Sequence, residues 1–350
     1  MPQLEQLSAQ LDRLAAFEPG PFPVISLYLS LQANDRGRDS VEPFLRKELA
    51  ERLRTYGADG PERRSLDDDL RKIDEYVAQR SPSANGLALF TSSGSDLFEA
   101  IQVAAPIDGH KLFIADRPHL YPLAKVLDQY PRYLVLLADT HTARIFVFAA
   151  NTVERSHRIE GTKTKHHSMG GWSQARYQRH TENYHLHHAK EVADAVARIV
   201  RDEGIERIVV RGEETILPLL REQLPKEVNE RIIDIVRLEP HASERDVLEA
   251  SIAALRENDA ETDRERVDQL IGAYRANGLA RVGVDAVRKA FTLGQVDELL
   301  IPASPQKIGE KVADELVAQS RNTSARIRFI EDASMLESVG GVGAFLRFKL

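Results

Sequence analysis

The chain has 350 residues, of which 42% are hydrophobic and 29% charged, and its formal net charge is −7 at pH 7. This is an ordinary globular composition with enough length for two or three domains. The absence of cysteine excludes disulfides, thiolate metal sites and cysteine nucleophiles. The net negative charge argues against a protein that binds nucleic acid with its whole surface.

The first part of the chain is predicted to mix helices and strands. Leu45, Leu49 and Leu53 recur at the i, i+4, i+8 spacing of one helix face. PFPVISLYLSL follows a Pro/Gly signal and is rich in β-branched and aromatic residues, which favours a strand. Together with GLALFTS after the turn cluster SPSANG, these patterns predict helices over 3–16, 41–56 and 67–79 and strands over 21–31 and 86–92.

The middle of the chain has the alternation of an α/β domain. YLVLLAD (133–139) and ARIFVFA (143–149) predict a β-hairpin, which VERSHRIEG continues. After residue 181 the predicted order is helix, strand, helix, strand and helix, over 182–202, 206–212, 213–224, 231–238 and 243–257. This order is typical of layered α/β domains. The charged run ENDAETDRER (257–266) is predicted to be a linker or an exposed helix.

The last part of the chain is predicted to be a smaller α/β unit, with a helix followed by strand, helix and two strands over 296–304, 308–320, 325–332 and 344–350. We therefore predict three domains, over 1–128, 129–266 and 267–350. The first 20 residues form an amphipathic pattern with acids rather than a signal peptide, and no run approaches the ~18 apolar residues of a membrane span. We expect a cytoplasmic protein with no membrane partner.

Residues 161–181, GTKTKHHSMGGWSQARYQRHT, contain no aspartate or glutamate although the chain is acidic. Gly170 and Gly171 precede Gln174, and glycines let a backbone approach RNA closely because they lack a Cβ. Basic side chains offset phosphate repulsion, and a tryptophan stacks on a base for roughly 1–3 kcal/mol. The predicted RNA-binding residues are Lys163, Lys165, Trp172, Arg176, Tyr177, Arg179 and His180. The alternative is a solvated connection whose glycines only form turns.

Several segments occur in the order of a known family. They are ISLYLSL, PSANGLALF, the hairpin YLVLLADTHTARIFVF, the glycine-pair loop before an Arg/His-rich helix, LIGAYRANGLARVGVDAVRKAFTLGQVDELLI and GGVGAFLRF. In this order the chain resembles the archaeal and eukaryotic class-one peptide chain release factors and their relative Pelota, and most of all their bacterial counterparts. The resemblance covers nearly the whole chain and depends on order and spacing rather than on any single piece.

The resemblance implies a three-domain translation factor of the α/β class that occupies the ribosomal A site. It implies a mixed-sheet α/β middle domain and an α/β C-terminal domain similar to ribosomal protein L7Ae. The implied partners are the ribosome, through 23S rRNA and peptidyl-tRNA, and a translational GTPase. In the family a Gly-Gly-Gln loop of the middle domain enters the peptidyl transferase centre. Gly170 and Gly171 match the glycine pair, and Arg176 and Tyr177 match an Arg-Phe pair that begins the next helix.

Two departures from the family pattern divide the functional predictions. Gln174 lies two positions later than the family glutamine, and the stop-codon motifs Asn-Ile-Lys-Ser and Tyr-x-Cys are absent, so stop-codon decoding is not expected. The first hypothesis is a release or rescue factor that hydrolyses peptidyl-tRNA through the catalytic residues Gly170, Gly171 and Gln174. A glutamine side chain cannot act as a general base. Gln174 would therefore act by positioning a water molecule and by hydrogen bonding to charge that develops in the transition state. The second hypothesis is a Balon-type ribosome hibernation factor without chemistry.

Seven of the eleven histidines fall between residues 157 and 188. A zinc site is one interpretation, but no acid accompanies these histidines at metal-ligand spacing, so we predict no metal and no cofactor. An RNA-facing helix with partly protonated imidazoles is the simpler interpretation. A nuclease acting on tRNA ranks last, because the loop has no carboxylates to hold magnesium.

Two other motifs are predicted to be structural. Gly340 and Gly341 begin a Gly-Gly-Val-Gly run that precedes a strand rather than a helix N-terminus, which favours a tight turn over a phosphate loop. Asp139, His141 and Arg144 suggest a triad, but they flank ordinary turn residues and no nucleophile elbow is present. Hairpin turn residues are therefore the better interpretation.

Overall fold

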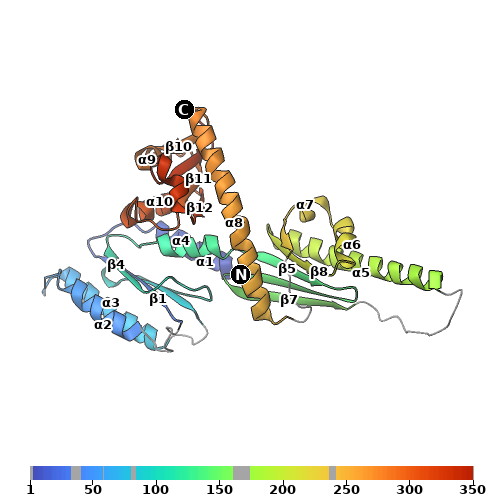
Figure 1. Ribbon diagram of the computed structural model, residues 1–350. Coiled ribbons are helices and arrows are strands. Elements are labelled where there is room, and N and C mark those ends of the chain that lie inside the picture. Colours follow the sequence, from blue (N-terminus) through green and yellow to red (C-terminus); the bar gives the residue numbers. More distant parts are fainter. Residues whose placement is uncertain are drawn as a thin grey trace. The chain divides into compact units, whose positions relative to one another are not determined.

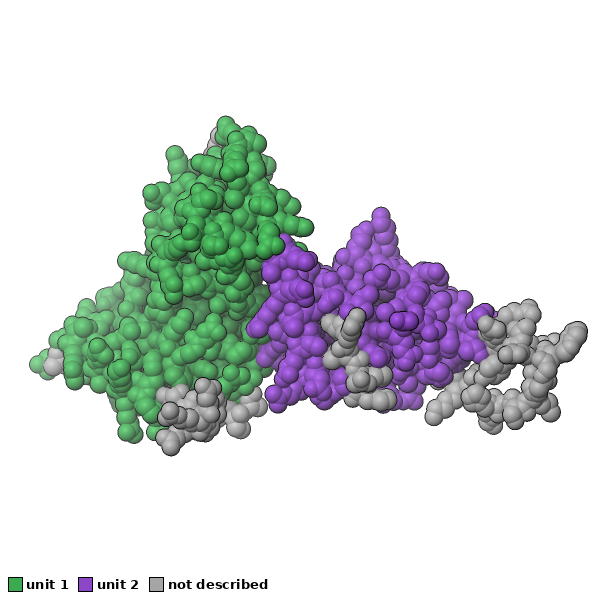
Figure 2. Space-filling model, in the orientation of Figure 1, with its two compact units in different colours: residues 1–130, 262–350 green, residues 131–261 purple. Residues whose placement is uncertain are grey.

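The computed structural model describes residues 3–32, 41–57, 59–79, 84–160, 174–235 and 242–349. In these residues helices pack against three β-sheets, so the predicted α/β fold class is confirmed (Figure 1). The chain divides into two compact units: unit 1 holds residues 1–130 and 262–350, and unit 2 holds residues 131–261 (Figure 2). No helix within the described ranges is long and apolar enough to cross a membrane.

The first sheet of unit 1 is antiparallel throughout and has the strand order β3-β2-β1-β4. Its elements are β1 (Val24–Ser30), α2 (Val41–Leu53), α3 (Pro61–Ala78), β2 (Gly86–Ser92), η1 (Ser93–Ser95), β3 (Leu97–Val103) and β4 (Lys111–Ala115). Leu45, Leu49 and Leu53 of α2 are buried in the core beneath this sheet, as their helical spacing predicts. Leu66 and Ile73 of α3 complete the same core.

The second sheet of unit 1 has the order β10-β13-β11-β12, in which only β11 and β12 are parallel. Its elements are β10 (Ala280–Val282), α9 (Val284–Thr292), β11 (Val296–Pro302), α10 (Glu310–Asn322), β12 (Arg326–Ile330), η2 (Ala333–Val339) and β13 (Gly343–Leu346). Gly340 and Gly341 both have a φ of 81°, in the left-handed region that favours glycine. They form the predicted tight turn before β13.

Polar contacts join the first and last parts of the chain within unit 1. Helix α4 (Tyr121–Gln129) has no capping side chain of its own at its N-terminus, and Asp314 of α10 supplies one. Asp314 Oδ1 accepts hydrogen bonds from the backbone N–H groups of Leu120 and of Tyr121, the latter at 3.1 Å, and lies 3.4 Å from His119 Nδ1. Helix α1 (Gln3–Ala15) packs against both α4 and α10. The division into three domains stays a prediction.

Unit 2 is built on a sheet with the order β7-β6-β5-β8-β9. Its elements are β5 (Tyr133–Ala138), β6 (Thr142–Ala149), β7 (Thr152–Glu160), α5 (Gln174–Asp202), β8 (Ile208–Gly212), α6 (Ile216–Gln223), α7 (Lys226–Asn229), β9 (Ile232–Ile235) and the first part of α8 (Glu244–Arg275). β5 and β6 form the predicted hairpin, and β5 also pairs in parallel with β8. Parallel neighbours need a crossover connection, and α5 lies in that crossover.

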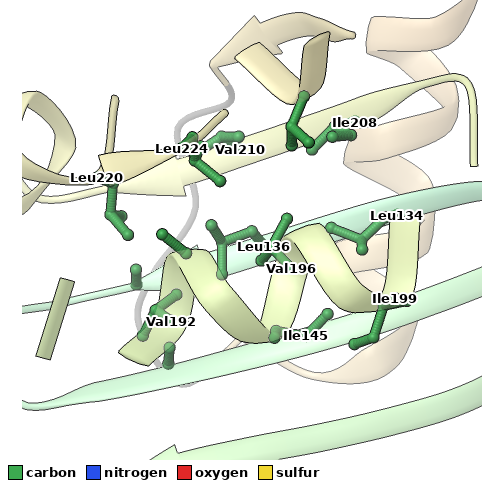
Figure 3. Close-up of a cluster of buried hydrophobic side chains, with 14 of the residues drawn as sticks. Leu134, Leu136, Ile145, Val192, Val196, Ile199, Ile208, Val210, Leu220 and Leu224 are labelled. Carbon is green, nitrogen blue, oxygen red and sulfur yellow. The ribbon is translucent and has the colours of Figure 1, made fainter. Parts of the chain in front are cut away.

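Both faces of the unit 2 sheet are covered by helices. Successive side chains of a strand point to opposite faces, so Leu134 and Leu136 join Val196 of α5 in one core (Figure 3). Tyr133 and Val135 belong to a second core, which α8 covers. Each fully buried leucine or valine contributes about 1.5–3 kcal/mol. Burial on both sides explains why β5 is a continuous apolar run rather than an alternating one.

The charged run 257–266 lies inside α8, which confirms the helix interpretation, and the division between the two compact units falls within the run, between residues 261 and 262. Asp263 within the run is 3% exposed, and its Oδ1 accepts a hydrogen bond of 2.7 Å from Arg328 Nε on β12. Glutamate and arginine have good helix propensity, and a partner on the sheet satisfies the buried carboxylate. The run therefore passes from unit 2 to unit 1 as a continuous helix, and Asp263 within it makes a polar contact with the second sheet of unit 1.

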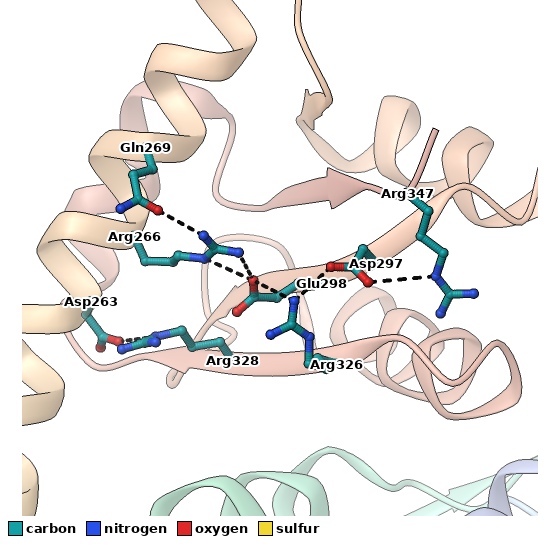
Figure 4. A network of polar contacts seen from close by, with 8 residues as sticks. All are labelled: Asp263, Arg266, Gln269, Asp297, Glu298, Arg326, Arg328 and Arg347. Atoms are coloured by element: carbon teal, nitrogen blue, oxygen red, sulfur yellow. Dashed lines mark hydrogen bonds and ion pairs between the residues drawn. The ribbon is translucent and has the colours of Figure 1, made fainter. Parts of the chain in front are cut away.

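A polar network holds α8 on the second sheet of unit 1 (Figure 4). Arg266 Nε lies 2.9 Å from Glu298 Oε2, and a second guanidinium nitrogen binds the same oxygen. The Arg266 guanidinium also lies over the Phe345 ring, 3.9 Å from its centroid. The Glu298 side chain is only 7% exposed, and Arg326 approaches it at 3.8 Å. A buried carboxylate of β11 is thus paired with cations from α8 and β12.

Candidate functional site

The predicted site residues lie between the end of β7 and the first turns of α5. Five of them lie outside the described residues: Lys163, Lys165, Gly170, Gly171 and Trp172. The backbone of the other five belongs to the first turns of α5: Gln174, Arg176, Tyr177, Arg179 and His180. The catalytic and RNA-binding assignments therefore stay predictions, and the described geometry is that of the base from which this segment leaves unit 2.

Helix α5 begins at Gln174, eight residues before the predicted start at residue 182. The stretch from Gln174 to His180 has few apolar residues in a helical repeat, so its pattern gave no helix signal. Its glutamines, alanine and arginines nevertheless have high helix propensity. The earlier start agrees with the resemblance, which places Arg176 and Tyr177 at the beginning of the helix.

The N-terminal part of α5 extends past the end of the sheet (Figure 1). Tyr184 and His185 lie beside the turn between β5 and β6, close to His141. Ten helical residues precede Tyr184, and at 1.5 Å per residue they span about 15 Å. The end of β7 lies at the same turn, because Glu160 pairs with Thr142. The β5–β6 turn therefore lies beside both the end of β7 and the Tyr184–His185 part of α5.

Asp139 shapes this turn. Its Oδ1 accepts hydrogen bonds from the backbone N–H groups of His141 at 2.7 Å and Thr142 at 2.6 Å, and its Oδ2 accepts one from the Thr142 hydroxyl at 2.7 Å. Burial raises the pKa of Asp139, but these hydrogen bonds outweigh burial and hold the pKa below its usual value. Arg144 donates instead to the Ala242 carbonyl at 2.8 Å. Asp139 and His141 belong to the turn and Arg144 to β6, so these three residues do not form a catalytic triad.

Aromatic rings from α5 gather over the turn. The His141 ring lies 5.8 Å from the Tyr184 ring and 6.2 Å from the His185 ring, measured between centroids. Burial lowers the pKa of His185, and the neighbouring His141 lowers it further, while Glu213 has the opposite effect. A histidine with a lowered pKa is neutral at pH 7. His185 therefore carries little positive charge at pH 7, whereas the sequence suggested a partly protonated imidazole.

His188 lies one turn further along α5 and is 2% exposed. Burial lowers the pKa of His188, although the Thr142 backbone and the carboxylates of Glu191 and Asp139 favour its charged form. Neither ring nitrogen of His188 has a hydrogen bond in the described part of the chain, and nor does the buried Tyr184 hydroxyl. Burial also raises the pKa of that hydroxyl. The base of α5 is thus an uncharged cluster that would be expensive to ionise.

This arrangement is suited to holding the helix rather than to chemistry of its own. Burial lowers the pKa of His185 and of His188, which makes both side chains poor cations at pH 7. Among the residues that the structure describes, no group of three or more His, Cys, Asp or Glu side chains is placed to hold a metal ion. The i, i+4 spacing of Tyr184 and His188 was visible in the sequence, but their burial depends on the turn around Asp139, which lies far away along the chain.

A cavity of about 890 Å³ lies in unit 1 between α10 and residues 113–120. His119 lines the cavity, is 7% exposed and stacks on Phe113 with the ring centroids 3.7 Å apart. The charged side chains around it include both signs, among them Arg117, Lys311, Asp116 and Glu310. This mixture selects neither an anion nor a cation, so the cavity does not define a class of ligand.

Part of this chain is similar in sequence to known proteins. Residues 118–256 match the model of bacterial archaeo-eukaryotic release factor family 10. The chain is 26% identical to a protein pelota homolog of Pyrococcus furiosus over 172 residues, which cover 46% of this chain and 48% of that protein. It is also 26% identical to an uncharacterized protein of Mycobacterium tuberculosis over 349 residues, which cover 95% of this chain and 85% of that protein.

Among solved structures, a model of ribosome-bound archaeal Pelota and ABCE1 has a TM-score of 0.46 and 15% sequence identity, and covers 99% of this chain and 94% of that one. The sequence matches confirm the predicted resemblance: the chain is similar to bacterial archaeo-eukaryotic release factor family 10 over residues 118–256 and to a Pelota homolog. Within that class, the segment with the Asp139 turn and α5 matches the bacterial family 10. The chain spans about half the length of the Pelota relative.

Proposed function

We propose that this protein binds the ribosomal A site and hydrolyses the peptidyl-tRNA ester without reading a stop codon. The observation that carries the proposal is the release-factor family match over residues 118–256, which includes the β7–α5 connection with its glycine pair. Gly170, Gly171 and Gln174 are the proposed catalytic residues. The proposed partners are 23S rRNA and peptidyl-tRNA, together with a translational GTPase, and the proposed C-terminal domain is of the L7Ae type.

The proposed role of the β7–α5 connection follows from its chemistry and its attachment. Glycines without Cβ atoms allow the backbone to approach a nucleotide, and Lys163 and Lys165 offset the repulsion between phosphates and an acidic chain. Gln174 contributes by orienting water and by hydrogen bonding to charge that develops in the transition state. Gln174 is the first residue of α5 and lies about 15 Å along the helix from Tyr184, which is beside the β5–β6 turn.

A release assay tests the catalytic part of the proposal. Ribosomes that carry labelled peptidyl-tRNA are incubated with the protein, and freed peptide is measured over time. Gly170→Ala with Gly171→Ala should reduce release to the background rate. Gly272→Ala is a matched control, because a Cβ at this position of α8 meets nothing within 4 Å. Release by the double variant at the rate of the control would refute the catalytic assignment.

The second candidate function is Balon-type hibernation, in which the protein occupies the A site without chemistry. The observation in its favour is that Gln174 lies two positions further from the glycine pair than the family glutamine. Sedimentation of the protein with the same ribosomes separates the two functions. Co-sedimentation without any freed peptide selects hibernation, whereas peptide release that Gln174→Ala abolishes selects hydrolysis.

The RNA-binding residues need a test that does not depend on catalysis. Lys163→Glu with Lys165→Glu should weaken co-sedimentation with ribosomes, because each reversed charge repels phosphate. Lys226→Glu with Arg46→Glu is the control with the same change in net charge, since these side chains are 88% exposed on α7 and 86% exposed on α2, away from the β7–α5 connection in sequence. Equal loss of binding in both variants would assign the effect to net charge rather than to this segment.

A further inference from the structure

Exposed apolar side chains gather at one end of the C-terminal part of unit 1. Among the described residues, seven large hydrophobic side chains are 40–48% exposed: Phe98, Leu186, Ile235, Tyr274, Leu279, Leu293 and Phe348. Four of the seven lie within residues 274–348, at the end of α8, before β10, after α9 and after β13. We define the C-terminal patch as Leu279, Leu293 and Phe348, with Tyr274 at its edge.

Backbone hydrogen bonds bring these residues together. The Leu346 N–H donates to the Leu279 carbonyl at 3.0 Å, which continues the pairing of β10 with β13. The Gln295 side-chain amide donates to the Phe348 carbonyl at 3.3 Å, and Gln295 follows Leu293 by two residues. Figure 1 shows the end of α8, β10 and the C-terminus at the same end of this part. Residues from three separate segments therefore meet there.

One face of the sheet carries part of the patch. Ala280 belongs to the core beneath α8, so the preceding Leu279 points to the opposite face. Directly opposed residues of an antiparallel pair share a face, and residues two apart on one strand do as well. Leu346 is therefore on the face of Leu279, and Phe348 follows two residues beyond the end of β13. Helix α9, which ends next to Leu293, packs against β10 and β13.

The surroundings of the patch are basic, although the chain as a whole is acidic. Between Asp268 and Asp297 the only acid in the sequence is Asp285, and no acidic residue follows Glu337. The basic residues next to the patch include Arg275, Lys289 and Lys349, which are exposed. None of these three forms an ion pair within the part of the chain that the structure describes, and Lys349 Nζ instead donates to the Asn277 carbonyl at 2.7 Å. Their charges are available to an external partner.

We propose that the C-terminal patch docks an acidic, amphipathic segment of a partner protein. Phe348 and Tyr274 could stack on bases, but Leu279 and Leu293 cannot, and this aliphatic half of the patch favours a protein over RNA. The basic rim complements acidic side chains and repels basic ones. An amphipathic helix that places leucines or phenylalanines on one face and glutamates on the other meets both requirements. The proposal does not depend on peptidyl-tRNA chemistry.

Fluorescence anisotropy on the full chain tests this assignment. The probe is a fluorescein-labelled 20-residue helical peptide with Leu and Phe on one face and Glu on the other. Its comparison peptide has Lys in place of every Glu, and a labelled 20-nucleotide poly(U) RNA is the third probe. The patch variant combines Leu279→Ser, Leu293→Ser and Phe348→Ser. The matched control combines Phe98→Ser, Leu186→Ser and Ile235→Ser, which removes equally exposed side chains elsewhere.

The expected result is binding of the Glu peptide, weakened at least tenfold in the patch variant and less than twofold in the control variant. Arg275→Glu with Lys349→Glu should weaken the Glu peptide and strengthen the Lys peptide. Circular dichroism melting of each variant verifies folding, and the charge variant repeats the test if the patch variant melts early. Equal affinity for the Glu and Lys peptides would overturn the proposal. So would poly(U) binding that the patch variant loses, since it would assign the surface to RNA.

Discussion

Replacing Glu298 with glutamine measures what the polar network of Figure 4 contributes to the C-terminal part of unit 1. The change preserves the side-chain volume and removes the charge that Arg266 and Arg326 approach. Breaking a buried ion pair by removing one partner costs about 3–5 kcal/mol. Arg266 is 28% exposed and keeps the Gln269 side chain and the Phe345 ring as partners. We therefore expect a smaller loss, of about 2–3 kcal/mol.

Hydrogen exchange followed by mass spectrometry measures this loss locally, because peptides from β11 report on this part of the chain alone. A loss of about 2–3 kcal/mol corresponds to about 30- to 150-fold faster exchange. Glu337→Gln is the control, since its ion pair with Lys307 has side chains that are 49% and 57% exposed and such pairs contribute about 0–1 kcal/mol. If Glu298→Gln accelerated β11 exchange no more than Glu337→Gln, the reasoning from burial would be refuted.

Acidification should loosen unit 2 through His188. Burial lowers the pKa of His188 below its unfolded value of about 6.5, so stability is lost as the pH falls below that value, by at most about 1.4 kcal/mol per pH unit. Urea unfolding at pH 7 and pH 5 measures how far the free energy of unfolding falls on acidification. We expect a smaller fall for His188→Gln than for the unaltered chain, and equal falls would contradict this prediction. Asp314→Ala should remove the cap of α4 and destabilise unit 1 by about 1–2 kcal/mol, whereas Asp285→Ala should not destabilise it. Proteolysis in urea measures the stability of unit 1 in both variants. Equal losses of stability would contradict the assignment of Asp314 as the cap. Ribosome binding should weaken with salt with a logarithmic slope of about −3, because the segment offers the four cations Lys163, Lys165, Arg176 and Arg179. A much steeper slope would show that other basic surfaces contact RNA.

The elements that the sequence predicted well are those specified by residues close together in the chain. The hairpin of β5 and β6 has two apolar runs and a turn, and the leucines of α2 repeat on one face. Helix α4 was missed, and its N-terminus shows why: the side chain that caps it is Asp314, which lies 193 residues away from Tyr121. A start signal supplied by tertiary structure is invisible to local patterns.

The same distinction separates the predicted from the unpredicted parts of the candidate site. The sequence identified an acid-free segment with a glycine pair and a histidine-rich helix, because composition is a local property. It did not predict that His188 is buried and neutral, since that depends on the contact of α5 with the turn around Asp139. Strands β3 and β4 were missed for a related reason: their side chains are mostly half-buried, and Glu99 of β3 is satisfied by Arg13 of α1 at 2.9 Å.

The placement of charge, rather than the net charge, determines how such a chain can approach RNA. The sequence holds 54 acidic residues against 47 Lys and Arg, and Glu160 and Glu182 bound the acid-free segment. Electrostatic forces decay over about 8 Å at physiological ionic strength, so a phosphate responds to the nearest charges only. Along the axis of α5, Arg176 lies about 12 Å and Arg179 about 8 Å before Tyr184, which are one to one and a half such lengths from the β5–β6 turn. The same cations spread over the sheet of unit 2 would lie beside its acids and attract phosphate less strongly, which is the physical reason to expect the proposed RNA contacts at the acid-free segment.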